Sequence, residues 1–208
     1  MAKNALQYRI DAIEGRRVLI APLNWGIGHA TRCIPIIKRL LEAGEEEIVA
    51  HGVAADGYPL LLLQKTFPQL LCIEFKWVDI HYSKANSQVL PIMWQIPKFM
   101  YAIFREHNTL KHIVNTYGID TIISDNRFGL WHKKVKSIYI THQIGVIVSP
   151  KNKALNYLAY LLHKNIINRY DECWIPDFEG TDNLSGDLSH KYPLPENAYF
   201  VGILSRFQ

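Results

Sequence analysis

A short glycine-containing segment near the start of the chain carries residues suited to chemistry. Its sequence is Asn24-Trp25-Gly26-Ile27-Gly28-His29-Ala30-Thr31, and it follows the apolar run 17–22. Glycines let a backbone turn tightly and approach a ligand, and the N–H groups at a helix start favour polar oxygen atoms. A histidine at such a position can act as a general base near neutral pH, so His29 is the candidate base. A close-packed turn that binds no ligand is the alternative interpretation.

Polar residues also follow two later apolar runs. Asp125-Asn126-Arg127 follows the run 120–124, and His142-Gln143 follows the run 137–141. A carboxylate at position 125 could orient a histidine or bind sugar hydroxyls, although an Asx turn explains the same spacing. The predicted site therefore has His29 and Asp125 as catalytic residues. Its predicted substrate-binding residues are Asn24, Gly26, Gly28, Thr31, Asn126, Arg127, His142 and Gln143.

The glycine segment does not fit a dinucleotide site. That fingerprint has a third glycine and, roughly 20 residues later, an acidic residue that binds the ribose. Here Thr31 occupies the third glycine position, and the next apolar run ends in His51-Gly52 where the carboxylate would be expected. An NAD-dependent enzyme is therefore disfavoured.

Short apolar runs alternate with helix-length segments along the chain, as in a parallel sheet with crossover helices. The predicted strands are 17–22, 47–52, 71–75, 120–124, 137–141, 172–176 and 199–202, and 76–88 and 177–196 are predicted loops. The predicted helices are 29–43, 54–66, 153–170 and 90–117, the last as one or two helices with a kink at Pro97. These elements predict an α/β fold with a single doubly wound, mainly parallel, Rossmann-like sheet. Ligands of such sheets bind beyond the carboxyl ends of the strands.

Composition and charge are those of a globular protein of one domain. The 208 residues are 49% hydrophobic and 20% charged, which predicts a single globular domain. We expect this domain over 17–208, after an N-terminal extension over 1–16. The net charge of +4 is scattered and does not predict nucleic-acid binding. Cys33, Cys72 and Cys173 lie far apart in apolar sequence, which predicts neither a disulfide framework nor a metal site. No segment has the pattern of a signal peptide or a membrane span, so a cytoplasmic location is expected.

The segment 90–104 is unusually rich in apolar and aromatic residues. A helix that faces the core is the first interpretation of this composition. An interfacial surface is the second, and with Trp77 and Tyr82 nearby it could contact a lipid-linked or aromatic acceptor at the inner face of a membrane.

The order of these motifs resembles the N-terminal domain of GT-B glycosyltransferases, and more narrowly the bacterial peptidoglycan N-acetylglucosaminyltransferase family. The resemblance rests on Val18-Leu19-Ile20-Ala21-Pro22 with Gly26-Ile27-Gly28-His29, on Ile123-Ser124-Asp125-Asn126, on Thr141-His142-Gln143 and on Tyr199-Phe200-Val201-Gly202. It covers nearly the whole chain after the N-terminal extension. One departure is that the corresponding loop of the peptidoglycan enzyme is richer in glycine, which leaves the identity of the nucleotide-sugar donor open.

The resemblance implies an inverting transfer of a sugar from a nucleotide-sugar to a hydroxyl acceptor, without a metal or a cofactor. His29 matches the histidine to which the role of base is often assigned, and Asp125 would steady it. Gly26 and Gly28 would approach the phosphates or the sugar of the donor.

The resemblance also implies that a C-terminal, donor-binding domain would complete the enzyme after Gln208, in cis or in trans. The chain would then be the acceptor half, either as a truncated piece or as a natural half-enzyme, and inactive alone. A sugar or a lipid-linked acceptor would be the second substrate. Two alternatives stay open, which are a sugar-nucleotide 2-epimerase or hydrolase of the same fold and a non-catalytic glycan-binding module.

Overall fold

A seven-stranded sheet forms the centre of the molecule, with strand order β3-β2-β1-β4-β5-β6-β7 and every neighbouring pair parallel. The computed structural model describes residues 5–14, 16–24, 26–42, 47–52, 58–75, 89–149 and 152–207. The strands are β1 (Arg17–Pro22), β2 (Glu47–Gly52), β3 (Leu71–Glu74), β4 (Thr121–Asp125), β5 (Lys136–Ile140), β6 (Glu172–Ile175) and β7 (Ala198–Phe200). The predicted fold class, a doubly wound parallel sheet, is confirmed.

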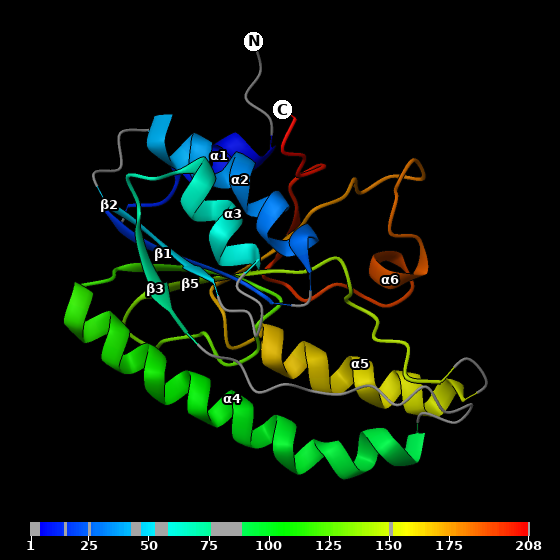
Figure 1. The fold of residues 1–208 in the computed structure, drawn as a ribbon. Helices are drawn as coiled ribbons and strands as arrows, with labels where there is room; N and C mark the ends of the chain where they lie inside the picture. Colours follow the sequence, from blue (N-terminus) through cyan, green and yellow to red (C-terminus); the bar gives the residue numbers. More distant parts are fainter. Residues whose placement is uncertain are drawn as a thin grey trace.

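Helices cover both faces of this sheet (Figure 1). On one face lie α1 (Ala5–Asp11), α2 (Ile27–Glu42) and α3 (Tyr58–Thr66). On the other face lie α4 (Val89–Tyr117) and α5 (Lys153–Ile167), while the short α6 (Asp187–His190) lies beside the sheet. The layers follow from the alternation of strands and helices, because each crossover helix must return the chain to the start of the next parallel strand.

The apolar strands supply cores to both helical layers. Successive strand residues point to opposite faces, so Ile20 packs in the core under α2 while Leu19 packs in the core under α4. Because both faces are covered, β4 and β5 are buried along nearly their whole length. The central strands therefore hold their carboxyl ends at fixed positions.

The predicted N-terminal extension contains a helix that packs on the domain. Leu6 and Ile10 of α1 are buried in the same core as α2. Arg39 Nη1 also donates to Gln7 Oε1 at 2.6 Å. Residues 5–11 therefore belong to the α1–α3 layer.

The long helix α4 is one helix of 29 residues that continues through Pro97, which is one of the two predicted arrangements. The burial of its side chains differs from the prediction. The first interpretation of 90–104 had its side chains in the core, but Met100, Tyr101 and Phe104 are exposed. The predicted loop 76–88, with Trp77 and Tyr82, lies outside the described residues.

The segment after β6 is more ordered than the exposed loop predicted for 177–196. Asp177 is buried, and its carboxylate accepts hydrogen bonds from the backbone N–H groups of Leu184 at 2.9 Å and Ser185 at 2.8 Å. The Ser185 hydroxyl also donates to Asp177, and α6 follows directly. The hydrogen bonds to one buried carboxylate thus stabilise a segment whose composition indicated only an exposed loop.

These hydrogen bonds make the segment sensitive to acid. Burial opposes the charge of Asp177, but the hydrogen bonds from Ser185 and Leu184 prevail and lower its pKa to about 2. Since the folded pKa lies below the ordinary value of about 4, the stabilisation is complete above that value and is lost as the pH falls through about 2. We expect the amide NMR signals of Leu184 and Ser185 to shift near this lower pH. Asp177→Asn should remove the transition, whereas Asp182→Asn, at an exposed position, should keep it.

Candidate functional site

The carboxyl ends of β1 and β4 bring His29 and Asp125 together. The two strands are neighbours, with Pro22 paired to Asp125, and α2 begins at Ile27 so that His29 lies in its first turn. His29 Nδ1 lies 3.2 Å from Asp125 Oδ1. The carboxylate is fully buried, while the His29 side chain keeps 15% of its surface exposed. The residues predicted as a catalytic pair therefore contact each other, and the imidazole can reach solvent.

Arg32 is a third member of this cluster that the sequence reasoning missed. Its guanidinium holds the Asp125 carboxylate with two hydrogen bonds, from Nε to Oδ2 at 2.6 Å and from Nη2 to Oδ1 at 2.7 Å. Nη2 also lies 2.6 Å from His29 Nδ1. Arg32 lies three residues after His29 on the same helix, where side chains are neighbours. That spacing was the available signal in the sequence, but the predicted site included only residues that follow the strands.

His142, which follows β5, reaches the same guanidinium. Its Nδ1 lies 3.1 Å from Arg32 Nη1. Since β5 is the neighbour of β4, the predicted meeting of His142 with His29 and Asp125 has a direct geometric cause. Side chains from α2, β4 and the segment after β5 thus converge on one arginine.

The cluster is electrostatically coupled. Burial acts to raise the pKa of Asp125, but the neighbouring Arg32 and His29 lower it below its ordinary value. Burial likewise opposes the charge of Arg32, and Asp125 raises its pKa nevertheless. For His142, burial and the nearby Arg32 both lower the pKa. A buried carboxylate and guanidinium therefore stay charged beside a neutral His142 at neutral pH.

The glycine segment leaves open space at the start of α2. A Cβ atom added to Gly26 or Gly28 would meet no described heavy atom within 4 Å. Thr31 Oγ1 donates to Gly28 O at 2.9 Å, so this hydroxyl closes the first helical turn. Asn24 Oδ1 is buried and has no hydrogen-bond donor among the residues that the structure describes. The backbone of the segment is thus accessible, and Thr31 supports its shape.

The two glycines should respond differently to substitution. Gly26 has φ +122°, where a side chain is strained, whereas Gly28 has no positive φ. We expect Gly26→Ala to lower the free energy of unfolding by about 1–3 kcal/mol, as for other residues forced into such backbone conformations. Gly28→Ala should leave it unchanged or slightly higher, since Ala favours helices. Urea denaturation of both variants measures the difference, and equal losses would contradict the backbone explanation.

Asn126 supports the turn after β4 from within. It has φ +57°, and its Oδ1 accepts hydrogen bonds from Tyr139 at 3.1 Å and Thr141 at 3.4 Å. Thr141 Oγ1 in turn accepts the backbone N–H of Gln143 at 3.1 Å. The Tyr139 hydroxyl also lies 3.2 Å from Nε2 of the buried His163. The structure thus connects Asn126 and Gln143 to the framework that holds the turns after β4 and β5.

The structure does not place Arg127 with the other predicted residues. Its side chain is fully buried and pairs with Glu106 of α4 at 2.5 Å. Its guanidinium also lies 4.5 Å from the centre of the Phe75 ring. Because Asp125 points toward α2 and Arg127 toward α4, Arg127 supports the fold from the opposite face of the sheet.

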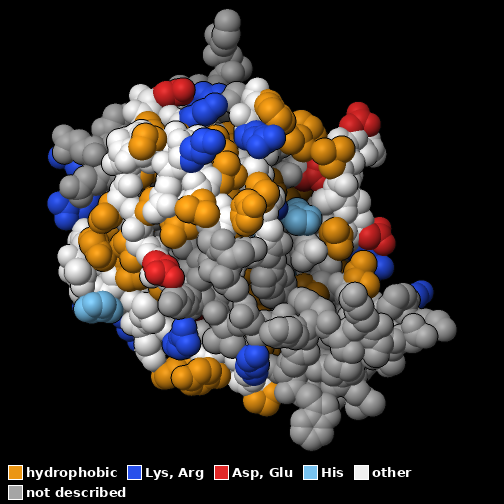
Figure 2. All heavy atoms as spheres, in the orientation of Figure 1, with side chains coloured by type: hydrophobic (Ala, Val, Ile, Leu, Met, Phe, Trp, Pro, Cys, Tyr) orange, Lys and Arg blue, Asp and Glu red, His pale blue; other side chains and the backbone are white. Residues whose placement is uncertain are grey.

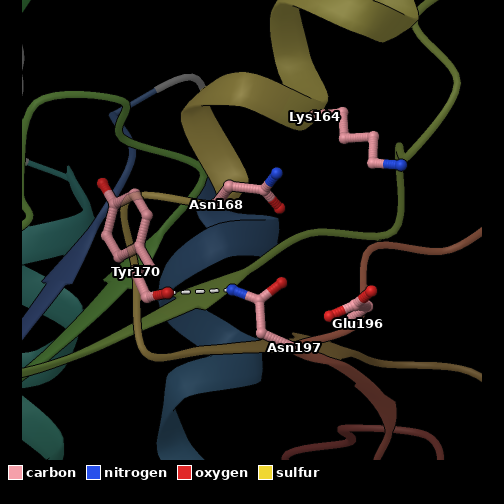
Figure 3. Close-up of a pocket in the computed structure, with 5 residues that line it drawn as sticks. All are labelled: Lys164, Asn168, Tyr170, Glu196 and Asn197. Atoms are coloured by element: carbon pink, nitrogen blue, oxygen red, sulfur yellow. Dashed lines mark hydrogen bonds between the residues drawn. The ribbon is translucent and has the colours of Figure 1, made fainter.

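Other features of the described chain lie apart from this cluster. A pocket of about 390 Å³ is lined by Lys164, Asn168, Tyr170, Glu196 and Asn197 (Figure 3). Tyr170 and Asn197 precede β6 and β7, so this pocket lies at the amino ends of those strands. Among the described residues, no group of three or more His, Cys, Asp and Glu side chains is arranged to hold a metal ion. On the face seen in Figure 2, basic side chains are scattered among hydrophobic and neutral ones.

Comparisons with known proteins identify the fold. No protein-family model matches the chain, and no curated protein matches it. Among solved structures, a putative UDP-N-acetylglucosamine 2-epimerase from Listeria monocytogenes is similar over 88% of this chain and 43% of its own, with TM-score 0.54 and 10% identity. A second UDP-N-acetylglucosamine 2-epimerase is similar over 88% and 47%, with TM-score 0.52 and 10% identity. A UDP-glucosyltransferase from Polygonum tinctorium that glucosylates indoxyl is similar over 93% and 53%, with TM-score 0.50 and 15% identity.

These likenesses concern the fold. The chain spans about half the length of each of these structures. It has the Rossmann-like architecture of one half of the GT-B fold, which glycosyltransferases and epimerases share. The resemblance seen in the sequence is thereby confirmed at the level of fold.

Proposed function

We propose that this chain, which has the fold of one half of a GT-B protein, is the acceptor-side half of an inverting glycosyltransferase. The observation that carries the proposal is the contact of His29 with Asp125 beside the open glycine segment. A histidine with a buried carboxylate partner and an exposed edge is suited to general-base catalysis. The site also lies at the carboxyl ends of the central strands, where doubly wound sheets bind ligands.

In the proposed reaction, His29 accepts the proton of an acceptor hydroxyl while the hydroxyl oxygen attacks the anomeric carbon of a nucleotide-sugar. The bond between that carbon and the phosphate oxygen breaks, and the nucleoside diphosphate leaves with the electron pair. The configuration of the anomeric carbon is thereby inverted. Asp125 stabilises the imidazolium that forms, as a buried carboxylate does in other histidine-based sites. The proposed displacement uses neither a metal nor a cofactor.

The open space at Gly26 and Gly28 suits the donor. Backbone N–H groups at a helix start and a closely approaching backbone favour phosphate oxygens, and α2 begins at Ile27. The donor-binding domain, in cis or in trans, would supply the rest of the donor site.

The acceptor is proposed to be a sugar or a lipid-linked sugar. Exposed Met100, Tyr101 and Phe104 on α4 would suit an apolar acceptor or a peripheral contact at the inner face of a membrane. No helix in the described part of the chain is long and apolar enough to cross a bilayer. A cytoplasmic location is part of the proposal.

The test combines this chain with its donor-binding half and supplies a panel of nucleotide-sugars with sugar and lipid-linked acceptors. We expect release of nucleoside diphosphate and formation of a glycosylated acceptor only when both substrates are present. Absence of transfer for every donor and acceptor, while the donor half still binds a nucleotide-sugar, would contradict the proposal.

A sugar-nucleotide 2-epimerase or hydrolase is the second candidate. It is motivated by the similarity in fold to two UDP-N-acetylglucosamine 2-epimerases, each over 88% of this chain. Such an enzyme converts its nucleotide-sugar without any acceptor. Incubation without an acceptor, followed by NMR of the sugar product, separates the two functions. A glycan-binding module would bind acceptor sugars and give no product in either assay.

A further inference from the structure

Three atoms at the centre of the site contact one another in pairs. Arg32 Nη2 lies 2.6 Å from His29 Nδ1 and 2.7 Å from Asp125 Oδ1, and the last two atoms lie 3.2 Å apart. An arginine guanidinium can only donate hydrogen bonds, and an ionised carboxylate can only accept them. His29 Nδ1 can therefore accept from Arg32 or donate to Asp125, but it cannot do both.

The distances favour the contact with Arg32. If Nδ1 carried a hydrogen, the 2.6 Å separation would force an imidazole N–H against a guanidinium N–H. If Nδ1 is unprotonated, that separation is a short charge-assisted hydrogen bond from Arg32. Nδ1 and Asp125 Oδ1, 3.2 Å apart, are then neighbours without a hydrogen bond between them. The hydrogen of neutral His29 then lies on Nε2. This arrangement is opposite to the one that a base acting through Nε2 requires.

His142 is held by the same guanidinium. Its Nδ1 lies 3.1 Å from Arg32 Nη1, so it too accepts a hydrogen bond and carries its own hydrogen on Nε2. In this structure the guanidinium is held beside both histidines by Asp125, which accepts hydrogen bonds from Nε and Nη2 and is itself fully buried. One residue thus determines the protonated nitrogen of two histidines.

We propose that Arg32 is a positioning residue that keeps the hydrogen of His29 on Nε2 and so prevents His29 from acting as a base until the guanidinium leaves Nδ1. The catalytic consequence rests on the proposed function. Once Arg32 withdraws, the hydrogen of the neutral ring lies on Nδ1, which donates a hydrogen bond to Asp125, and the lone pair of Nε2 becomes available to the acceptor hydroxyl. The site as folded is therefore the resting form of the His29–Asp125 pair.

The test is NMR of the 208-residue chain with ¹⁵N-labelled histidine, recorded over a series of alkaline pH values at which the histidine signals no longer change. Loss of one set of signals in His29→Gln assigns His29. In the unsubstituted chain we expect Nδ1 of His29 to give the signal of an unprotonated ring nitrogen and Nε2 that of a protonated one. In Arg32→Met we expect Nδ1 of His29 to give the signal of a protonated ring nitrogen and Nε2 that of an unprotonated one. Lys38→Met, at an exposed position of the same helix, is the matched control and should leave the pattern unchanged.

A protonated Nδ1 in the unsubstituted chain overturns the proposal, and this measurement needs no variant. An unchanged pattern in Arg32→Met overturns it as well. If Arg32→Met does not fold, Arg32→Lys keeps a charge for Asp125 but lacks the planar fork that also reaches His29, so it should give the same exchange. The measurement uses no substrate, so it is independent of catalysis. Failed sugar transfer with the expected NMR pattern would remove the proposed function and leave the role of Arg32 intact.

Discussion

Replacing His29 by alanine is expected to lower kcat for sugar transfer by about 10²- to 10⁴-fold, the usual contribution of a positioned general base. The imidazole keeps 15% of its surface exposed, whereas Asp125 is fully buried. Without the ring, the acceptor hydroxyl must lose its proton to water as it attacks. The measurement is the initial rate at saturating donor and acceptor, made on this chain combined with the proposed donor-binding half.

His112→Ala is the matched control for that experiment. His112 is exposed on α4, outside the His29 cluster, and its removal should leave kcat unchanged. Because His29 lies in the first turn of α2 and contacts Arg32, its truncation should lower the thermal unfolding temperature but leave the protein folded, which circular dichroism checks. Undiminished turnover of the folded His29→Ala protein would exclude His29 as the base.

Replacing Glu106 by glutamine is expected to lower the free energy of unfolding by about 3–5 kcal/mol, the usual cost of removing one partner of a buried ion pair. Glu106 Oε1 lies 2.5 Å from both Nε and Nη2 of Arg127, and both side chains are almost entirely buried. A neutral amide at position 106 would not balance the buried charge of Arg127. Burial raises the pKa of Glu106, although Arg127 opposes the change. Equilibrium denaturation in urea measures the loss.

The close packing around this pair adds to the expected effect. Glu106 Oε2 accepts the backbone N–H of Gly129 at 3.2 Å, and a Cβ at Gly129 would lie 2.6 Å from the Ile103 carbonyl oxygen. Glu179→Gln, at an exposed position after β6, is the control and should change the free energy of unfolding by no more than about 0.5 kcal/mol. A loss as small for Glu106→Gln would show that the buried pair does not stabilise the fold.

Much of the fold could be predicted because its physical signals are local. The apolar runs at 17–22 and 47–52 became β1 and β2 with the predicted bounds. The other strands shifted by one or two residues, since apolar composition does not locate the last hydrogen bond of a ladder. The α1 helix was missed because its seven residues are stabilised by contacts with α2 rather than by a local pattern.

The continuous α4 helix shows the limit of a local rule. Pro97 left open whether 90–117 forms one helix or two, because proline lacks an N–H group and crowds the preceding turn. It lies inside a helix of 29 residues, whose remaining turns outweigh the loss at one position.

The segment 177–196 shows a second limit, because its order comes from a buried side chain and not from its composition. Its composition predicted an exposed loop, but the buried Asp177 carboxylate accepts hydrogen bonds from the backbone N–H groups of Leu184 and Ser185 in the same segment.

The candidate site was predicted where a residue type and a strand end coincide. His29, Asp125 and His142 all follow or adjoin strand ends, and the parallel order of β1, β4 and β5 brings them together. Arg127 also follows β4, but its side chain points to the opposite face and pairs with Glu106. The position of a residue in the sequence could not reveal this difference, because it depends on the face of the sheet toward which each side chain points.

The doubly wound sheet, and the places of His29 and Asp125 at the ends of strands, could be predicted from the sequence alone. Periodic apolar runs carry that information, since each one specifies the faces that an element must bury. The contacts of Arg32 with His29, Asp125 and His142 are known only from the folded structure. A hydrogen bond depends on the distance between atoms from segments that are far apart in sequence. The spacing of Arg32 from His29 along α2 indicates that the two side chains are neighbours, but the contacts of Arg32 with Asp125 and His142 depend on the packing of α2, β4 and β5.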